Sequence, residues 1–177
     1  DCVCALQFAK EDDDPPMTGE ITAEPIGPDA IERMLKRLDA LPLGLVKDDA
    51  FRISVAGAQE KTSLLWHNGH WHKPLGTTPT THILKPSIGQ LPNGIDLSDS
   101  VENEYYCLHF LTLCGLPTAR AQIQRFGQMQ ALVVERFDRL LTTDKRLLRR
   151  PQEDCCQALA TPPVLKYQND GGPTLND

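Results

Sequence analysis

Residues 82–115 read HILKPSIGQLPNGIDLSDSVENEYYCLHFLTLCG. The first four, HILK, are typical of a short buried strand, and the proline after them ends it. A long helix is predicted over residues 99–114, where Glu104 lies on the apolar side, three residues after Val101. A carboxylate in that position is costly without a cation beside it. Lys85, at the end of the strand, is the natural partner. The alternative is a glutamate that reaches water at the edge of the apolar stripe.

The long helix carries sequence signals at both ends. Asp99 and Glu102 are predicted to form a capping box, and Gly115 is placed to end the helix. The apolar face that is expected to pack on the rest of the domain consists of Val101, Tyr105, Leu108 and Leu111.

A second helix is predicted over residues 27–41. Ile31, Leu35 and Leu38 recur at helical spacing, and Asp29 with Glu32 offers a capping box.

Short stretches of alternating apolar and polar residues predict strands. They cover residues 51–55, 61–66, 119–126 and 129–134, with tight turns at residues 68–69 and 127–128. Few helices and many short strands, joined by tight turns, indicate an α+β fold. We expect a mostly antiparallel sheet with helices packed against it.

Residues 54–62, SVAGAQEKT, join two of the predicted strands. Small residues let a backbone approach a bound phosphate closely, so that its N–H groups act as donors. With a single glycine, this loop taken alone is better explained as a plain hairpin. Together with Lys85 and Glu104 it favours a nucleotide site, because a strand lysine followed by a helix with an inward glutamate is the arrangement of a kinase N-lobe.

Composition limits the other classes of function. A formal net charge of -6 argues against a broad nucleic-acid surface. The sequence has no apolar run long enough for a signal peptide or a membrane span, so we expect a cytoplasmic location and no membrane partner. The six cysteines are then expected to be reduced thiols.

Two further groups of residues have a competing interpretation. His67, His70 and His72 lie around a predicted turn and could hold a transition metal, although an exposed hairpin tip is the simpler interpretation. A basic stretch is read as a solvated face rather than as a nucleic-acid site. It consists of Arg136, Arg139, Arg146, Arg149 and Arg150.

Several blocks of the sequence, in order, resemble the HipA toxin kinases. They are FRISVAGAQEKT (51–62), TPTTHILK (78–85), SVENEYYC (100–107), VERFDR (134–139), LRRPQED (148–154) and DGGP (170–173). The resemblance covers nearly the whole chain and is weakest in the acidic stretch after residue 10. It implies a two-lobed kinase fold, distantly like that of the phosphoinositide kinases, which uses ATP with Mg²⁺.

The resemblance also assigns roles. The loop from Ala56 to Lys61 would cover the phosphates, Lys85 would contact them, and the segment from Glu135 to Phe137 would hold adenine through its backbone. The residues implied in ATP binding are Ala56, Gly57, Ala58, Gln59, Glu60, Lys61, Lys85, Glu135, Arg136 and Phe137. Neither a catalytic residue nor a metal ligand is implied within this chain.

The family's reported target is glutamyl-tRNA synthetase, whose phosphorylation arrests growth and produces persistence. A HipB antitoxin neutralises the toxin and links it to DNA. Four segments are expected: a remnant strand of an upstream subdomain (1–10), an acidic linker (11–27), the nucleotide-binding N-lobe (28–150) and a truncated start of the C-lobe (151–177). The family's catalytic aspartate and Mg²⁺ ligands would follow residue 177, so this chain alone is expected to be inactive. The competing interpretation is a non-catalytic module that binds an antitoxin or a complementary chain.

Ser54 precedes the loop, and the matching serine of the HipA family is an autophosphorylation site. A phosphate there would add roughly -1.5 to -2 charge beside a loop that receives the phosphates of ATP. We therefore predict that Ser54→Asp in the full-length protein weakens ATP binding, whereas Ser54→Ala leaves the fold intact. Calorimetric titration with Mg-ATP measures both effects, and equal affinity of Ser54→Asp and the unmodified protein would refute the switch.

Overall fold

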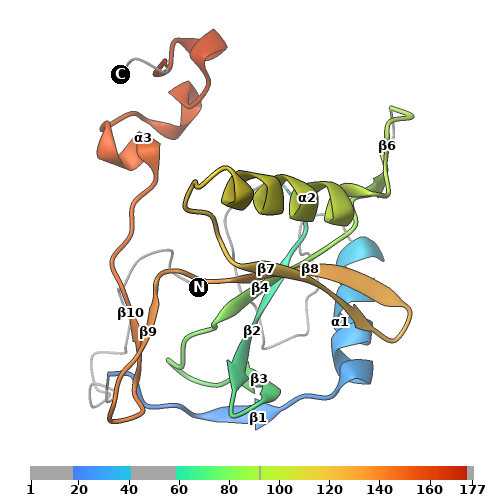
Figure 1. Cartoon of the computed structure of the whole chain (residues 1–177), viewed down its shortest axis with the longest axis vertical. Coiled ribbons are helices and arrows are strands. Elements are labelled where there is room, and N and C mark those ends of the chain that lie inside the picture. The colour runs from blue at the N-terminus through green and yellow to red at the C-terminus, as the bar shows by residue number, and fades with distance from the viewer. Residues whose placement is uncertain (1–17, 41–58, 92, 175–177) are drawn as a thin grey trace.

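The computed structural model describes residues 18–40, 59–91 and 93–174 (Figure 1). The strands expected over residues 1–10 and 51–55, and most of the phosphate loop with Ser54, lie outside the described residues.

The centre of the molecule is a six-stranded sheet in which all neighbouring strands are antiparallel. In spatial order its strands are β1 (Ala23–Pro25), β3 (His70–Pro74), β2 (Thr62–His67), β4 (His82–Pro86), β8 (Met129–Glu135) and β7 (Ala121–Phe126). The predicted α+β class with a mostly antiparallel sheet is confirmed, as are both predicted hairpin turns. The edge strand β1 falls inside the segment that was expected to be an acidic linker.

Two small sheets and three short helical turns lie outside the main sheet. The small sheets pair β5 (Gly89–Gln90) with β6 (Asp96–Leu97), and β9 (Arg139–Leu141) with β10 (Leu147–Arg149). The helical turns are α3 (Cys155–Ala158) and the 3₁₀ turns Pro163–Leu165 and Gln168–Asp170. In Figure 1 the chain leaves the sheet after β10, and these turns lie apart from it.

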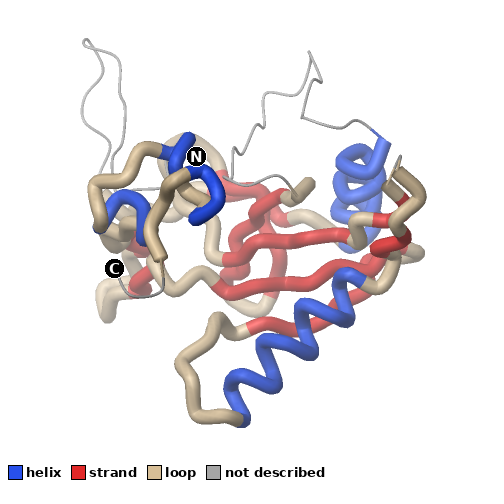
Figure 2. The backbone as a smooth tube through the Cα atoms, turned by 90° about the horizontal axis from the view of Figure 1, so that it is seen from above, coloured by secondary structure: helices blue, strands red, loops and turns tan. Residues whose placement is uncertain are grey.

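The sheet lies between two helices, α1 (Pro28–Ala40) and α2 (Ser100–Leu113) (Figure 2). On the α1 side, Ile31 and Leu35 are fully buried in one cluster with Leu64, Leu84 and Val133. Full burial of one such side chain contributes about 1.5–3 kcal/mol. This cluster is the principal core, and it fixes which face of each central strand turns toward α1.

Neither predicted capping box forms. At the start of α1, the N–H groups of Ala30 and Ile31 donate to the carbonyl of Gly27, so the helix begins two residues earlier than a cap at Asp29 would require. Asp99 precedes α2, but its side chain makes no capping hydrogen bond.

The two expected capping glutamates contact the sheet instead. Glu32 accepts a hydrogen bond from the backbone N–H of Gln128 (3.0 Å) in the β7–β8 turn, and it also pairs with Lys36. Glu102 accepts one from the side-chain amide of Gln130 (2.5 Å) on β8. Each helix is thereby tied to the sheet by a residue in its first turns.

The end of α2 is as predicted, but its apolar face is only partly covered. Gly115 has φ +82°, and the N–H of Leu116 bonds back to the carbonyl of Leu111, as in a Schellman motif. Val101 is buried, whereas the side chain of Leu111 is exposed. Only the first half of the helix therefore packs closely on the sheet.

Gly127 gives a test of the contact between α1 and the sheet. Its φ is +60°, and an added Cβ would overlap the carboxylate of Glu32. Gly69 has φ +81° with open space around it, and is therefore a matched control. We expect Gly69→Ala to lower the free energy of unfolding by about 1–2 kcal/mol through the positive φ alone. Gly127→Ala should lose about 1 kcal/mol more, because Glu32 must release the N–H of Gln128.

Urea denaturation of both variants measures the difference. If both variants lose the same free energy of unfolding, the contact with α1 contributes nothing to stability. The same conclusion follows if the difference between them persists when Glu32 is also replaced by alanine.

Candidate functional site

Lys85 and Glu104 form an ion pair between β4 and α2. Nζ of Lys85 donates to Oε1 of Glu104 at 2.6 Å. The two side chains are 24% and 34% exposed, so the pair lies at an open edge of the interface. A pair this exposed stabilises a fold by only about 0–1 kcal/mol. Its main effect is to hold an ammonium group in place on the α2 side of the sheet.

Lys61 brings a second cation to the same region. Its Nζ donates to the carbonyl of Gln59 at 2.8 Å, and the side-chain amide of Gln59 donates to the carbonyl of Pro86 at 3.3 Å. Burial, and after it the charge of Lys85, lower the pKa of Lys61, while the charges of Glu60 and Glu104 raise it. Two ammonium groups that interact electrostatically favour a ligand with several negative charges.

Four of the predicted site residues lie outside the described residues: Ser54, Ala56, Gly57 and Ala58. The structure thus brings together Gln59, Lys61, Lys85 and Glu104 from the predicted set.

The predicted hinge follows the end of β8. Glu135 lies opposite His82 in the β4–β8 ladder. Its N–H donates to the carbonyl of Arg120 (2.8 Å), and that of Arg136 donates to the carbonyl of Thr81 (2.9 Å). Within the described part of the chain, the N–H of Phe137 has no hydrogen-bond partner, and the Phe137 side chain is 73% exposed. Of the three hinge residues, Phe137 therefore offers the backbone donor to a ligand.

A buried ion-pair cluster of Arg136, Asp138 and Arg139 lies next to the hinge. Nε and Nη2 of Arg136 donate to the two carboxylate oxygens of Asp138 at 3.0 and 2.9 Å. Nη1 of Arg139 donates to Oδ2 of Asp138 at 2.7 Å, and all three side chains are at most 7% exposed. The expectation of a solvated basic face is thus wrong for Arg136 and Arg139, because Asp138 pairs with both of them inside the protein.

The pKa values follow from this arrangement. Burial raises the pKa of Asp138, but the hydrogen bonds and charge of Arg136, with the charge of Arg139, outweigh it and hold the pKa below its ordinary value. Burial, with the charge of Arg136, lowers the pKa of Arg139 to about 10. Asp138 and Arg139 are therefore both charged at neutral pH.

The ion-pair cluster also connects separate segments of the chain. Nε of Arg139 donates to the carbonyl of Thr80 at 2.6 Å, just before β4. The carbonyl of Asp138 accepts from the N–H of Arg150 at 2.8 Å, after β10. Sequence reasoning missed Asp138 altogether. The available signal was a run of three charged residues (136, 138 and 139) directly after an apolar strand.

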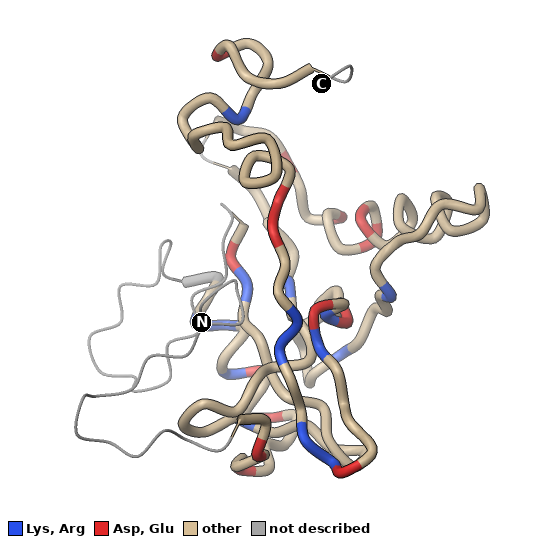
Figure 3. Tube along the Cα trace, turned by 90° about the vertical axis from the view of Figure 1, so that its left-hand side faces the viewer, with Lys and Arg blue, Asp and Glu red and all other residues tan. Residues whose placement is uncertain are grey.

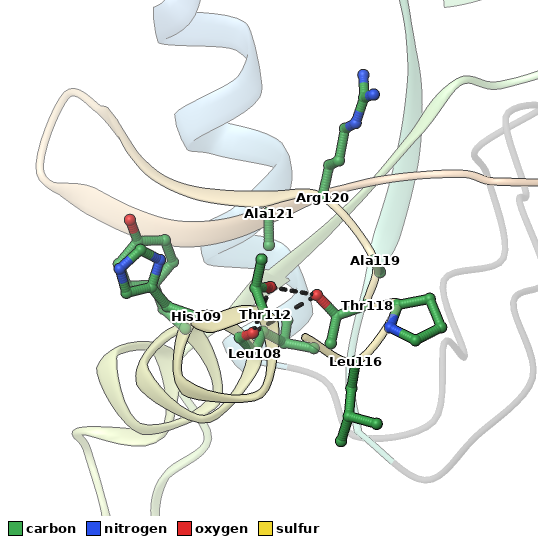
Figure 4. Close-up of a pocket in the computed structure, with 10 residues that line it drawn as sticks. Leu108, His109, Thr112, Leu116, Thr118, Ala119, Arg120 and Ala121 are labelled. Carbon is green, nitrogen blue, oxygen red and sulfur yellow. Dashed lines mark hydrogen bonds between the residues drawn. The ribbon is translucent and has the colours of Figure 1, made fainter. Parts of the chain in front are cut away.

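A cavity of about 440 Å³ lies between the second half of α2 and the start of β7 (Figure 4). Thr112 and Thr118 are hydrogen bonded to each other at 2.6 Å in its wall. The side chain of Arg120 extends away from this pair (Figure 4). None of the residues that the sequence assigned to ATP lines the cavity.

Other expectations can be compared with the described residues. His70 and His72 each direct Nδ1 at a backbone carbonyl, and no described group of three His, Cys, Asp or Glu side chains is placed to hold a metal ion. Acidic and basic residues are interspersed along the trace (Figure 3). No helix in the described ranges has the length and apolar character needed to cross a bilayer.

Sequence comparisons give relatives of one kind. The profile of the HipA-like C-terminal domain matches residues 53–177. The protein named "Putative kinase Y4mE" in Sinorhizobium fredii is 37% identical over 180 residues, which cover 100% of this chain and 41% of that protein. The "Serine/threonine-protein kinase toxin HipA" of Shewanella oneidensis is 34% identical over 122 residues, which cover 68% of this chain and 26% of that protein.

Structural comparison agrees. A chain in the solved Shewanella oneidensis complex of HipA, HipB and operator DNA matches with a TM-score of 0.67 and 29% identity, covering 98% of this chain and 38% of that chain. Our chain thus spans about two fifths of the length of Y4mE and of the matched structure. The domain profile covers most of this sequence, and the similarity to Y4mE extends over the whole of this chain. The chain therefore belongs to the HipA-like C-terminal domain family.

Proposed function

We propose that this chain is the ATP-binding N-lobe of a HipA-like serine/threonine protein kinase. The observation that carries the proposal is the Lys85–Glu104 ion pair between a sheet and a helix, with Lys61 beside it. Protein kinases hold the phosphates of ATP with a strand lysine that a helix glutamate positions in this way. Family membership and the kinase names of two relatives support the same assignment.

The two ends of the site are separated by a distance that suits a nucleotide. His82, opposite the hinge residue Glu135, precedes Lys85 by three strand residues. At about 3.3 Å per residue this is roughly 10 Å, which an extended nucleotide can bridge between its base and its phosphates. The phosphates would lie at Lys61 and Lys85. The base would lie at Phe137, whose N–H has no partner among the described residues.

Mg²⁺ does not fit this part of the site. Of the two carboxylates that act on Lys61, that of Glu104 is already paired with Lys85, and the described residues include no group of three His, Cys, Asp or Glu side chains that could hold a metal ion. Magnesium requires several oxygen ligands in octahedral geometry. We therefore assign ATP binding to this chain and no step of phosphoryl transfer.

Kinase activity, growth arrest and a protein substrate such as glutamyl-tRNA synthetase are proposed for the longer protein that contains this lobe. A HipB-like antitoxin, with DNA reached through it, is the proposed partner. The supports are the toxin name of one relative and the structural match within a HipA, HipB and DNA complex.

A non-catalytic binding module is the second candidate. It is favoured by the outward side of α2, where Tyr106, Phe110 and Leu113 repeat at helical spacing with exposed side chains. An exposed apolar stripe of this kind suits a protein partner. ATP binding separates the two candidates, since a module of this second kind has no need of Lys85.

We predict that Lys85→Met and Glu104→Gln each weaken ATP binding at least about tenfold, since a hydrogen bond to a charged group contributes about 1.5–3 kcal/mol. The double variant should lose little more than either single variant, because both changes remove one ion pair. Thermal stability should change little, as the pair is partly exposed.

Calorimetric titration with ATP measures all three variants. Lys36→Met is the matched control, because it removes a partly exposed ion pair with Glu32 on α1. Unchanged affinity in Lys85→Met, or additive losses in the double variant, would contradict the proposed site.

A further inference from the structure

The side chains on either side of Phe137 form a bridge across it. Arg136 and Asp138 are joined by two nearly equal hydrogen bonds, Nε to Oδ1 at 3.0 Å and Nη2 to Oδ2 at 2.9 Å. These side chains are 7% and 3% exposed, while Phe137 between them is 73% exposed. The exposed Phe137 ring has little protein around it to hold its position. Its backbone is therefore held from the two neighbouring residues, by this buried bridge and by the backbone hydrogen bonds of Arg136 and Asp138.

A two-point bridge restrains more than a single ion pair does. The planar guanidinium fork fixes both the distance and the relative orientation of the two side chains. Because the two residues are neighbours of Phe137, the bridge closes a ring that includes the peptide groups of Phe137. Arg139 adds a third hydrogen bond to the same carboxylate, and Nη1 of Arg136 reaches Oγ1 of Thr80 at 3.4 Å. The ring is therefore attached to the chain before β4.

We propose that Arg136 and Asp138 are positioning residues that hold the N–H of Phe137 in the direction of a nucleotide base. This inference rests on the proposed ATP-binding function and adds a basis for base selection to it. Adenine presents an acceptor, N1, on its Watson–Crick edge, whereas guanine carries a hydrogen at N1. An N–H donor with a fixed direction can form a hydrogen bond to N1 of adenine, but it cannot form one to the N1–H of guanine. The bridge thus selects ATP over GTP.

Arg136→Met tests the bridge. It removes both hydrogen bonds but leaves Asp138 paired with Arg139, so one carboxylate still balances one guanidinium in the interior. Arg146→Met is the matched control, because Arg146 pairs with Asp144 at the same two-residue spacing in the exposed β9–β10 turn. Each variant is titrated with ATP, with GTP and with inorganic tripolyphosphate by ligand-observed NMR.

We expect Arg136→Met to bind ATP about tenfold more weakly, the effect of releasing roughly one fixed backbone residue. Its preference for ATP over GTP should fall by a similar factor, while its affinity for tripolyphosphate stays within about twofold of the unmodified chain. The control should match the unmodified chain with all three ligands. Arg136→Lys keeps the charge but not the fork, so it should show the same loss of base preference with little loss of thermal stability.

Each other outcome overturns the inference. An unchanged ATP-to-GTP preference in Arg136→Met removes the role in base selection. Equal weakening of all three ligands shows a general structural role only. If Arg136→Met does not fold, Arg136→Lys decides, and retention of its base preference refutes the bridge. An unmodified chain that binds neither ATP nor tripolyphosphate refutes the proposed function itself, and the inference with it.

Discussion

The register of β4 on β8 is the constraint on which the rest of the site depends. Leu84 lies opposite Val133, and both side chains are buried on the α1 side. The next residue, Lys85, lies opposite Leu132 and points to the α2 side, where it meets Glu104. A slip of one residue would exchange the two faces and carry the lysine into the core.

Hydrophobic burial, and not the ion pair, enforces this register. Two buried side chains such as Leu84 and Val133 together contribute about 3–6 kcal/mol, several times the value of a partly exposed ion pair. The apolar core on the α1 side therefore positions the charged residues on the α2 side. Substitutions of Lys85 or Glu104 should therefore change ligand binding while lowering the stability of the fold only slightly.

The two ends of the site are held by different forces. At the phosphate end, the cations lie at an open edge, where long side chains can adjust to a ligand. At the hinge end, Asp138 is buried with two arginines. Loss of Asp138 would leave two buried guanidinium charges without their carboxylate, which costs several kcal/mol. The predicted hinge is therefore the rigid end of the proposed site, and Arg139 ties it through Thr80 to the strand that carries Lys85.

Much of this arrangement could be predicted from local sequence patterns. Alternating residues and tight turns gave the central hairpins, and the position of Glu104 on an apolar stripe indicated its cationic partner. The capping boxes were wrong because Glu32 and Glu102 find partners in the β7–β8 turn and on β8, far away in sequence. The burial of Asp138 was missed for the same reason. From sequence alone, a run of charged residues is predicted to be solvent-exposed, because the partners that bury it come from other parts of the chain.

The most direct measurement of the central claim is an amide NMR titration of this chain with ATP. If Lys61 and Lys85 receive the phosphates and Phe137 the base, the largest shift changes will occur at these three residues. The β9–β10 turn will remain unchanged. Shift changes centred on residues 67–72, or on the cavity between α2 and β7, would contradict the account.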